Sequence, residues 1–254
     1  MHADEGRDVV AHDRAGLLTA LLTDVRIDVR AHQRCDMPDR APAVPECLLP
    51  SPRRGDRILL PPPQTPTGEL EPTLRARTSV RTYAPKDVSP GELATLLAAA
   101  HAIDAGCWAG ERSAGVPLEL LCAARNVTGL APGLYAYDPE AHGLRLLAHL
   151  PRTDGTETLV LQREFAAAPV IMTVTGPLGA ALSRHGSHGH RLLLVRAGAT
   201  AHAAWLAGLG VGLVGSLFAG LLPDALRELA DVDGFIRAPL FALAIGHPQA
   251  TVLR

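Results

Sequence analysis

The chain has 254 residues and almost no lysine, and this absence limits the chemistry that it can perform. Of its 24 lysine and arginine residues only Lys86 is a lysine, so 23 are arginines. The arginine side chain stays charged in proteins and is a poor proton acceptor. A mechanism that needs a lysine as its base must therefore use Lys86.

The four cysteines lack the spacing of a metal site. They form no Cys-x-x-Cys pair or other common ligand pattern, so no metal is expected. The first residues contain acids with no apolar run behind them, which argues against a signal peptide. A net charge of −2 leaves no global basic field. The sequence thus predicts a cytoplasmic protein with free thiols and no nucleic-acid partner.

Charged residues are also missing from one long stretch. Positions 197–222 contain no Asp, Glu, Lys or Arg, and 26 residues are enough to span a bilayer. Six glycines and His202 dilute the apolar character of this stretch, however. A helix that is apolar on all sides can also lie at the buried centre of a dimer. We therefore predict a buried helix at Arg191–Leu209 and no membrane span.

Proline is crowded into the N-terminal part of the chain. Ten prolines lie between Pro38 and Pro72. Proline fixes φ and lacks an amide donor, so this stretch is neither helix nor sheet interior. We expect an N-terminal segment over 1–69, with a short helix at Ala15–Asp24 and a proline-rich arm that serves as a linker or wraps a partner subunit. The folded domain is expected over 70–254.

That domain is predicted to mix helices and strands. Ser89-Pro90-Gly91-Glu92 is typical of a helix start, with Ser89 as the cap. Apolar runs predict strands at Leu118–Ala124, Gly133–Tyr137, Leu144–Leu147, Val170–Thr175 and Leu240–Ile245. Further helices are expected at Leu159–Ala167, Arg191–Leu209 and Pro223–Ala230. The fold class is α/β or α+β.

One short segment has the residues of an anion cradle. Arg77, Thr78, Ser79 and Arg81 place two guanidinium groups four positions apart with hydroxyls between them. Such a set can hold a phosphate and the polar edge of a ring through bidentate, charge-assisted bonds. A solvated basic loop is the alternative, because short motifs also match by chance.

The segment resembles the Arg-x-Ser-x-Arg opening of the nitroreductase-like flavoenzymes. Later segments follow the same family in order, from Leu70 to Pro248, with Arg112 where a proline is usual before Ser113-Ala114-Gly115. Two segments are similar to the SagB-type (McbC-like) branch, namely Asn126–Asp138 and Arg184–Arg191. Two others resemble the glycine-rich loop and the closing turn of the family, namely Gly208–Ser216 and Ile245–Pro248.

The resemblance implies a fold and a cofactor. The fold is an α+β, nitroreductase-like fold with a mixed central sheet flanked by helices and a long buried central helix at a homodimer interface. The cofactor is flavin mononucleotide (FMN). The residues that the resemblance assigns to FMN are Arg77, Thr78, Ser79, Arg81, Ser113, Ala114, Gly115, Arg191, Gly215 and Ser216.

The resemblance also implies a reaction. Members of the SagB-type branch oxidise thiazolines and oxazolines in ribosomally made peptides to thiazoles and oxazoles. The implied partners are a precursor peptide and a cyclodehydratase-like enzyme. Where this branch carries a Lys-Tyr pair, the chain has Arg184-His185. Histidine titrates near neutral pH, so His185 is the candidate base, and a solvent-facing loop residue is the alternative.

Other interpretations of the residues stay open. A nicotinamide-dependent nitro or quinone reductase needs no side-chain base, so the missing lysine favours it. A flavin-binding scaffold subunit with little activity is also compatible with the missing lysine. His185, His188 and His190 could suggest a metal, but no carboxylate or cysteine accompanies them in sequence. Tyr135 and Tyr137 are more typical of core packing than of catalysis.

Overall fold

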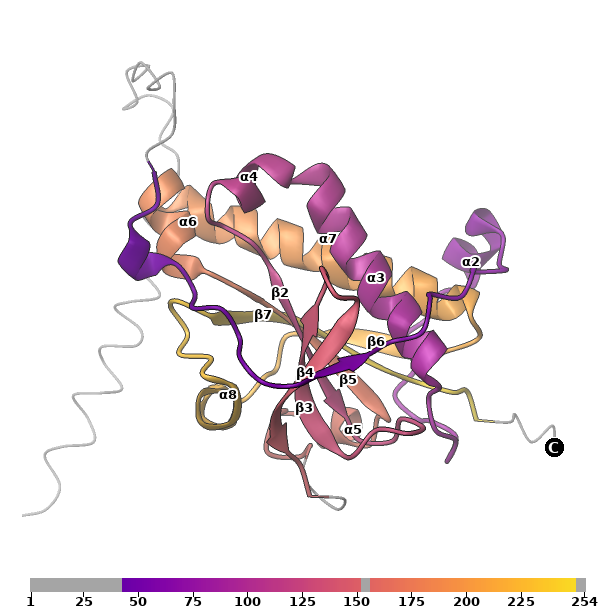
Figure 1. The fold of residues 1–254 in the computed structure, drawn as a ribbon. Coiled ribbons are helices and arrows are strands. Elements are labelled where there is room, and N and C mark those ends of the chain that lie inside the picture. Colours follow the sequence, from indigo (N-terminus) through magenta and orange to yellow (C-terminus); the bar gives the residue numbers. More distant parts are fainter. Residues whose placement is uncertain (1–42, 152–155, 250–254) are drawn as a thin grey trace, which may run out of the picture.

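Seven strands form one sheet in the part of the chain that the computed structural model describes, residues 43–151 and 156–249 (Figure 1). Their order across the sheet is β1-β4-β3-β2-β5-β7-β6. The strands are β1 (Arg57–Leu59), β2 (Glu119–Ala124), β3 (Gly133–Asp138), β4 (Gly143–His149), β5 (Val170–Gly176), β6 (Val214–Phe218) and β7 (Ala238–Gly246).

The expected α+β class is confirmed, and the sheet is more uniform than the mixed sheet that we expected. All six pairings between named strands are antiparallel. Within the described ranges, parallel pairing occurs only at the isolated bridge between Val88 and Val127. Short connections such as the β3–β4 turn favour antiparallel neighbours, because a parallel pair needs a long crossover.

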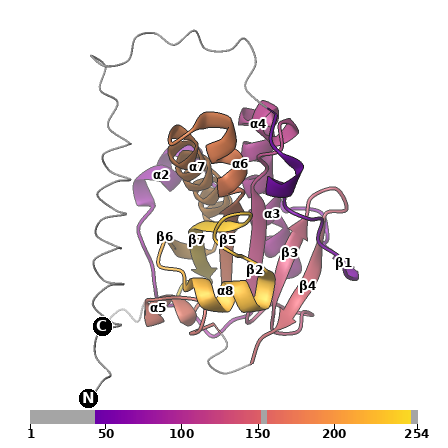
Figure 2. The ribbon, with the colours of Figure 1, turned by 90° about the vertical axis from the view of Figure 1, so that its left-hand side faces the viewer.

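Helices cover both faces of this sheet (Figure 2). The face with α3 (Pro90–Cys107), α6 (Leu178–His185) and α7 (His188–Gly210) buries the larger apolar cluster. The other face carries α5 (Arg163–Ala166) and α8 (Pro223–Ala230). Side chains alternate along β2, with Leu120 in the first cluster and Leu121 in the second. The sheet is therefore buried on both sides, as this period of two requires.

The start of α3 confirms the predicted cap. Ser89 Oγ accepts a bond from the Glu92 amide at 3.2 Å, and Glu92 accepts one from the Ser89 amide at 2.7 Å. This reciprocal pair satisfies two of the amides that a helix start leaves without partners. The cap sets where α3 begins, and α3 in turn carries Asp104 to the far end of the molecule.

The long helix α7 runs antiparallel to α3 across the sheet. Leu96 lies against Gly208 near one end of the pair, and Asp104 bonds Arg196 near the other. Among the described helices, α7 alone is long and apolar enough to span a bilayer, judged by length and composition. Half of the most apolar 18-residue stretch of this helix is buried inside the protein. The predicted helix at Arg191–Leu209 is thus confirmed as a helix that packs into the fold.

Several elements differ from the expected ones. The helix expected at Leu159–Ala167 is limited to α5, because the residues before Arg163 form turns. The short helices α2 (Leu70–Ala76), α4 (Ala109–Ser113) and α6 were not expected. Helices this short leave few residues to show a helical period, so tertiary packing decides them. Asp104 and Cys107 lie in the last turns of α3, and the helix expected at Ala15–Asp24 lies outside the described residues.

The proline-rich arm packs on its own domain. Residues 57–59 form the edge strand β1 against β4, and Leu60 is buried. The Thr67 amide bonds the Gly210 carbonyl at 3.0 Å. Prolines 61–63 begin two positions after the end of β1, which suits an edge strand because proline cannot donate to a further strand.

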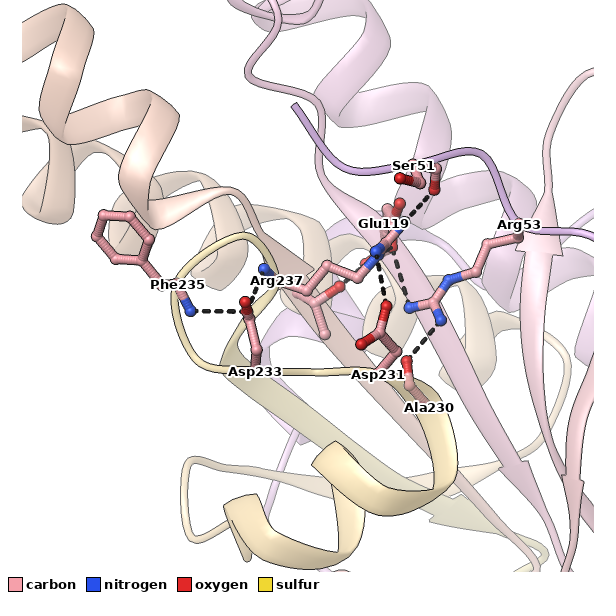
Figure 3. A network of polar contacts seen from close by, with 9 residues as sticks. Ser51, Arg53, Glu119, Ala230, Asp231, Asp233, Phe235 and Arg237 are labelled. Carbon is pink, nitrogen blue, oxygen red and sulfur yellow. Dashed lines mark hydrogen bonds and ion pairs between the residues drawn. The ribbon is translucent and has the colours of Figure 1, made fainter. Parts of the chain in front are cut away.

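A polar network fixes the start of this arm (Figure 3). Arg53 and Arg237 both contact Glu119 Oε2, at 3.3 and 2.9 Å. Arg53 also bonds the Ala230 carbonyl, and Arg237 bonds the Ser51 carbonyl. The arm is therefore tied to β2 and to the segment between α8 and β7.

Candidate functional site

The predicted cradle is an extended segment between α2 and the bridge from Tyr83 to Pro248. The Val80 amide bonds the Gly215 carbonyl of β6 at 3.0 Å, which anchors the segment at the edge of the sheet. Arg77 and Ser79 are exposed. The Arg77 guanidinium lies over the Trp205 ring, 4.6 Å from its centroid, a distance typical of a cation–π contact.

Arg81 lies at the other end of the cradle. Its side chain is about half exposed and faces Glu164 at 3.8 Å, a distance at which an exposed ion pair contributes little. The Phe165 ring is 5.6 Å from the Arg81 guanidinium. Two exposed guanidinium groups with the Thr78 and Ser79 hydroxyls between them form a donor set that suits a phosphate or a polar ring edge.

Gly215 and Ser216 lie in β6 and not in a glycine-rich loop. A Cβ at Gly215 would lie 2.4 Å from the Ala244 carbonyl oxygen of β7, so the packing of the sheet requires glycine there. Ser216 is buried, and its hydroxyl bonds the Leu217 carbonyl at 3.4 Å. The structure places both residues beside the cradle, and their contact with a flavin stays a prediction.

The second group of predicted residues lines a separate cavity of about 790 Å³. Ser113, Ala114 and Gly115 line it at the end of α4, and Arg184 lines it from α6. Gly115 has a φ of +89°, a conformation that favours glycine. The arm closes part of this cavity with Ala43, Val44 and Leu49.

A histidine–carboxylate pair lies beside this cavity. His185 Nε2 is 2.8 Å from Glu111 Oε2, and Arg184 Nε is 3.4 Å from the same oxygen. Burial alone would raise the pKa of Glu111, but the hydrogen bond and charge of His185 and the charge of Arg184 hold that pKa below its usual range. His185 is thus the last residue of α6, held by a carboxylate, rather than a solvent-facing loop residue.

The sequence alone missed Glu111. It lies two positions before Ser113, and 74 positions separate it from His185. The available signal was a lone acid next to the Ser113 segment, which is too common to single out.

Figure 1 shows α4 and α6 at one end of α7 and α2 at the other, so the two groups of predicted residues lie at opposite ends of α7. Arg77 contacts Trp205 near the end of α7, whereas Arg184 immediately precedes the start of α7. At 1.5 Å per residue, the 17 positions from His188 to Trp205 span about 25 Å. Arg191, exposed in an early turn of α7, lies at the Arg184 end. One protomer therefore does not bring all of these residues around one flavin.

A comparison with known families shows which family the chain belongs to. The family model described as "Nitroreductase family" matches residues 74–247, more than two thirds of the chain. The chain belongs to the nitroreductase family. Members of this family are oxidoreductases and generally use FMN.

Individual relatives agree with this assignment. A nitroreductase-like protein of Methanocaldococcus jannaschii is 27% identical over 198 residues, which cover 76% of this chain and 98% of that protein. The crystal structure of a nitroreductase-like protein of Anabaena variabilis matches with a TM-score of 0.65 at 23% identity, over 77% of this chain and 42% of that one. This chain thus spans less than half of the Anabaena protein.

A third relative was solved as a complex. The E. coli microcin synthetase McbBCD, with truncated pro-MccB17 bound, contains a chain that matches with a TM-score of 0.53 at 17% identity. The match covers 77% of this chain and 79% of that one. These structural likenesses show a nitroreductase fold. They leave the predicted branch within the nitroreductase family open.

Proposed function

We propose that this nitroreductase-family protein is an FMN-dependent oxidase or dehydrogenase in the maturation of a ribosomally made peptide, oxidising thiazoline or oxazoline rings to thiazole or oxazole rings. The observation that carries the proposal is the 2.8 Å contact between His185 and Glu111. Oxidation of an azoline removes a proton from a ring carbon, so it needs a base at the ring. Reduction of a nitro group or a quinone needs no such side chain.

The residues of the cradle suit FMN. Arg77 and Arg81 would contact the phosphate or the pyrimidine edge, with Thr78 and Ser79 as hydrogen-bond partners. Ser113, Ala114 and Gly115 would line the ring edge, with Arg191 near the phosphate and Gly215 and Ser216 behind the ring. When bound, FMN supplies the acceptor for the hydrogen and two electrons that leave the substrate.

His185 would act as the base. Glu111 holds the imidazole through Nε2, which leaves Nδ1 to accept the proton from the ring carbon. The carboxylate also stabilises the imidazolium that forms, in the manner of other carboxylate–histidine pairs. The low pKa of Glu111 keeps it anionic for this role. Arg184 would hold Glu111 in place.

A homodimer would complete the site. The two groups of predicted residues are about 25 Å apart in one protomer, by the rise of α7. If two α7 helices pack across a two-fold axis, the Ser113 segment (Ser113–Gly115) of one protomer can approach the cradle of its partner. The exposed apolar side chains of Leu194 and Val195 on α7 support such an interface.

Peptide partners belong to the same proposal. The McbBCD structure is of a complex with truncated pro-MccB17 bound, and this chain shares the fold of one of its chains. A precursor peptide and a cyclodehydratase-like enzyme are the proposed partners, in the cytoplasm. A nicotinamide-dependent nitro or quinone reductase is the second candidate, favoured by the absence of a lysine at Arg184-His185. A flavin-binding scaffold subunit would show neither activity.

Replacing His185 with alanine tests the base. We expect kcat for a thiazoline peptide, with oxygen present, to fall roughly 10²- to 10⁴-fold while FMN content is unchanged. Glu111→Gln should lower kcat less than His185→Ala and leave KM near the wild-type value, because it disturbs the orientation of the imidazole only.

The matched control is His188→Ala, an exposed histidine three positions away. It should keep wild-type kcat. Full peptide oxidation by His185→Ala would remove His185 as the base. Turnover of nitrofurans with NADPH, without any oxidation of the thiazoline peptide, would favour the reductase instead.

A further inference from the structure

A second cleft, of about 410 Å³, lies between the arm and the sheet. It shares no lining residue with the cavity at Ser113. Its apolar walls include Pro52 of the arm, with Pro117, Leu118 and Tyr137 from around β2 and β3. Four arginines also line it, namely Arg53, Arg57, Arg112 and Arg145.

Two carboxylates at this cleft, those of Asp138 and Glu119, each form ion pairs with two arginines. Asp138 Oδ2 forms ion pairs with Arg57 Nε at 3.0 Å and with Arg145 Nη2 at 2.7 Å. Burial would raise the pKa of Asp138, but its bond from the Ala141 amide and the two arginines hold that pKa below its usual range. Asp138, Arg57 and Arg145 together carry a net charge of +1.

Glu119 forms the second such group. Arg53 and Arg237 share its Oε2, as Figure 3 shows. Asp231 adds a further contact with Arg237, at 3.5 Å, from a side chain that is 85% exposed. Water screens that acid, so it offsets little of the charge facing the cleft. The buried Arg53 Nε has no hydrogen-bond partner among the described residues.

A third group lies behind Arg112. Asp104 accepts from Arg112 at 2.9 Å and from Arg196 at 2.8 Å, and Arg196 is fully buried. Its Nη1 has no partner in the described ranges. A buried surplus charge is costly unless an anion lies near. Burial and the positive charge of Arg112 lower the pKa of His101, against the opposite effect of Asp104.

Arg112 lies between the cleft and the cavity at Ser113. It lies in α4 between Glu111, which holds His185, and Ser113, which lines the cavity. The short helix α4 therefore separates the two spaces, with Arg112 on the cleft side. A chain with an anionic group in the cleft could reach the cavity by passing α4. The apolar walls suit a peptide better than a bare inorganic anion.

We propose that this cleft binds a carboxylate group of the peptide substrate, held by Arg57 and Arg112 against the Pro117, Leu118 and Tyr137 wall. This inference rests on the proposed function for the identity of the peptide. The carboxylate can come from an acidic side chain or from the C-terminus of the peptide. Arginine suits either, since its planar fork matches a carboxylate.

Calorimetric titration of the flavin-loaded protein with three synthetic peptides of one sequence tests the proposal. One carries a single Glu and an amidated C-terminus, one carries Gln with a free C-terminal carboxylate, and one carries Gln with an amide. At least one carboxylate peptide should bind about tenfold tighter than the uncharged one, as a charge-assisted bond allows. The peptide that gains affinity identifies the source of the carboxylate.

Variants locate the binding. Arg112→Gln and Arg57→Gln should each remove most of the carboxylate preference, and Arg75→Gln, an exposed arginine on α2 paired with Glu71, should keep it. Glu140→Gln should tighten binding of the carboxylate peptide a few-fold, because Glu140 is an exposed acid at this cleft. If the Arg112→Gln protein is too unstable to measure, the Arg57→Gln protein decides the test, because Arg57 is half exposed.

Equal binding of all three peptides, or no binding, would overturn the inference. So would a carboxylate preference that survives both Arg57→Gln and Glu140→Gln unchanged. Oxidation is measured separately, on a short azoline peptide without any carboxylate. Loss of that oxidation with an intact carboxylate preference would refute the proposed function and leave the cleft as a carboxylate site.

Discussion

Replacing Val195 with glutamate is expected to halve the molecular mass of the protein in solution and to release its flavin. Val195 is 64% exposed on α7, next to Leu194, which is 40% exposed. A charge in the apolar centre of the proposed interface should weaken dimerisation about 100-fold or more, equal to about 3 kcal/mol. Because the cradle and the Ser113 segment are at opposite ends of one protomer, the monomer would keep only half of a flavin site.

Analytical ultracentrifugation and the flavin absorbance of the purified protein measure the two effects. Leu59→Glu is the matched control, since Leu59 is 71% exposed on the edge strand β1 and does not belong to α7. It should leave the mass and the flavin content unchanged. A Val195→Glu protein that stays dimeric would exclude this face of α7 as the interface. A monomer with full flavin content would contradict the shared site.

Replacing Asp104 with asparagine is expected to cause the largest loss of stability. Asp104 is 2% exposed and is the carboxylate for both the buried Arg196 and Arg112. Removing its charge leaves buried arginine charge without compensation, which costs about 3–5 kcal/mol. In a domain of this size, that corresponds to a fall in Tm of roughly 6–20 °C.

Thermal unfolding followed by circular dichroism measures this loss. Asp224→Asn is the control, because Asp224 is 95% exposed and its contact with Arg227 is 3.6 Å long. Such a surface pair should change stability by less than about 1 kcal/mol. Combining Asp104→Leu with Arg196→Leu should recover much of the loss, since no unpaired charge then remains at Arg196. A Tm of Asp104→Asn within the error of the wild type would contradict this account.

Most of the regular elements were predictable from local pattern. The Ser89 cap, the strand at Val170–Thr175 and the helix at Pro223–Ala230 all lie where the sequence placed them. In each case the signal is local, because capping, β-branched runs and a proline at the first helical position act within a few residues. The order of the family motifs along the chain was also visible in the sequence alone.

The edge of the sheet was harder to predict. Proline content marked 38–72 as an arm, and residues 57–59 of that arm nevertheless complete the sheet as β1. A strand of only three residues carries too little pattern to be predicted from the sequence. Pairing with β4 and the network of Arg53, Glu119 and Arg237 decide this arrangement, through contacts between distant parts of the chain.

The sequence alone determined the family resemblance, the candidate cradle at Arg77–Arg81 and the loss of the lysine base. Only the tertiary structure showed that Glu111 holds His185 and that the cradle is far from the Ser113 segment. Local patterns record what neighbouring residues do. Glu111 and His185 are 74 residues apart, and Asp104 and Arg196 are 92 apart, so only the packing of α3, α4, α6 and α7 brings these charges together.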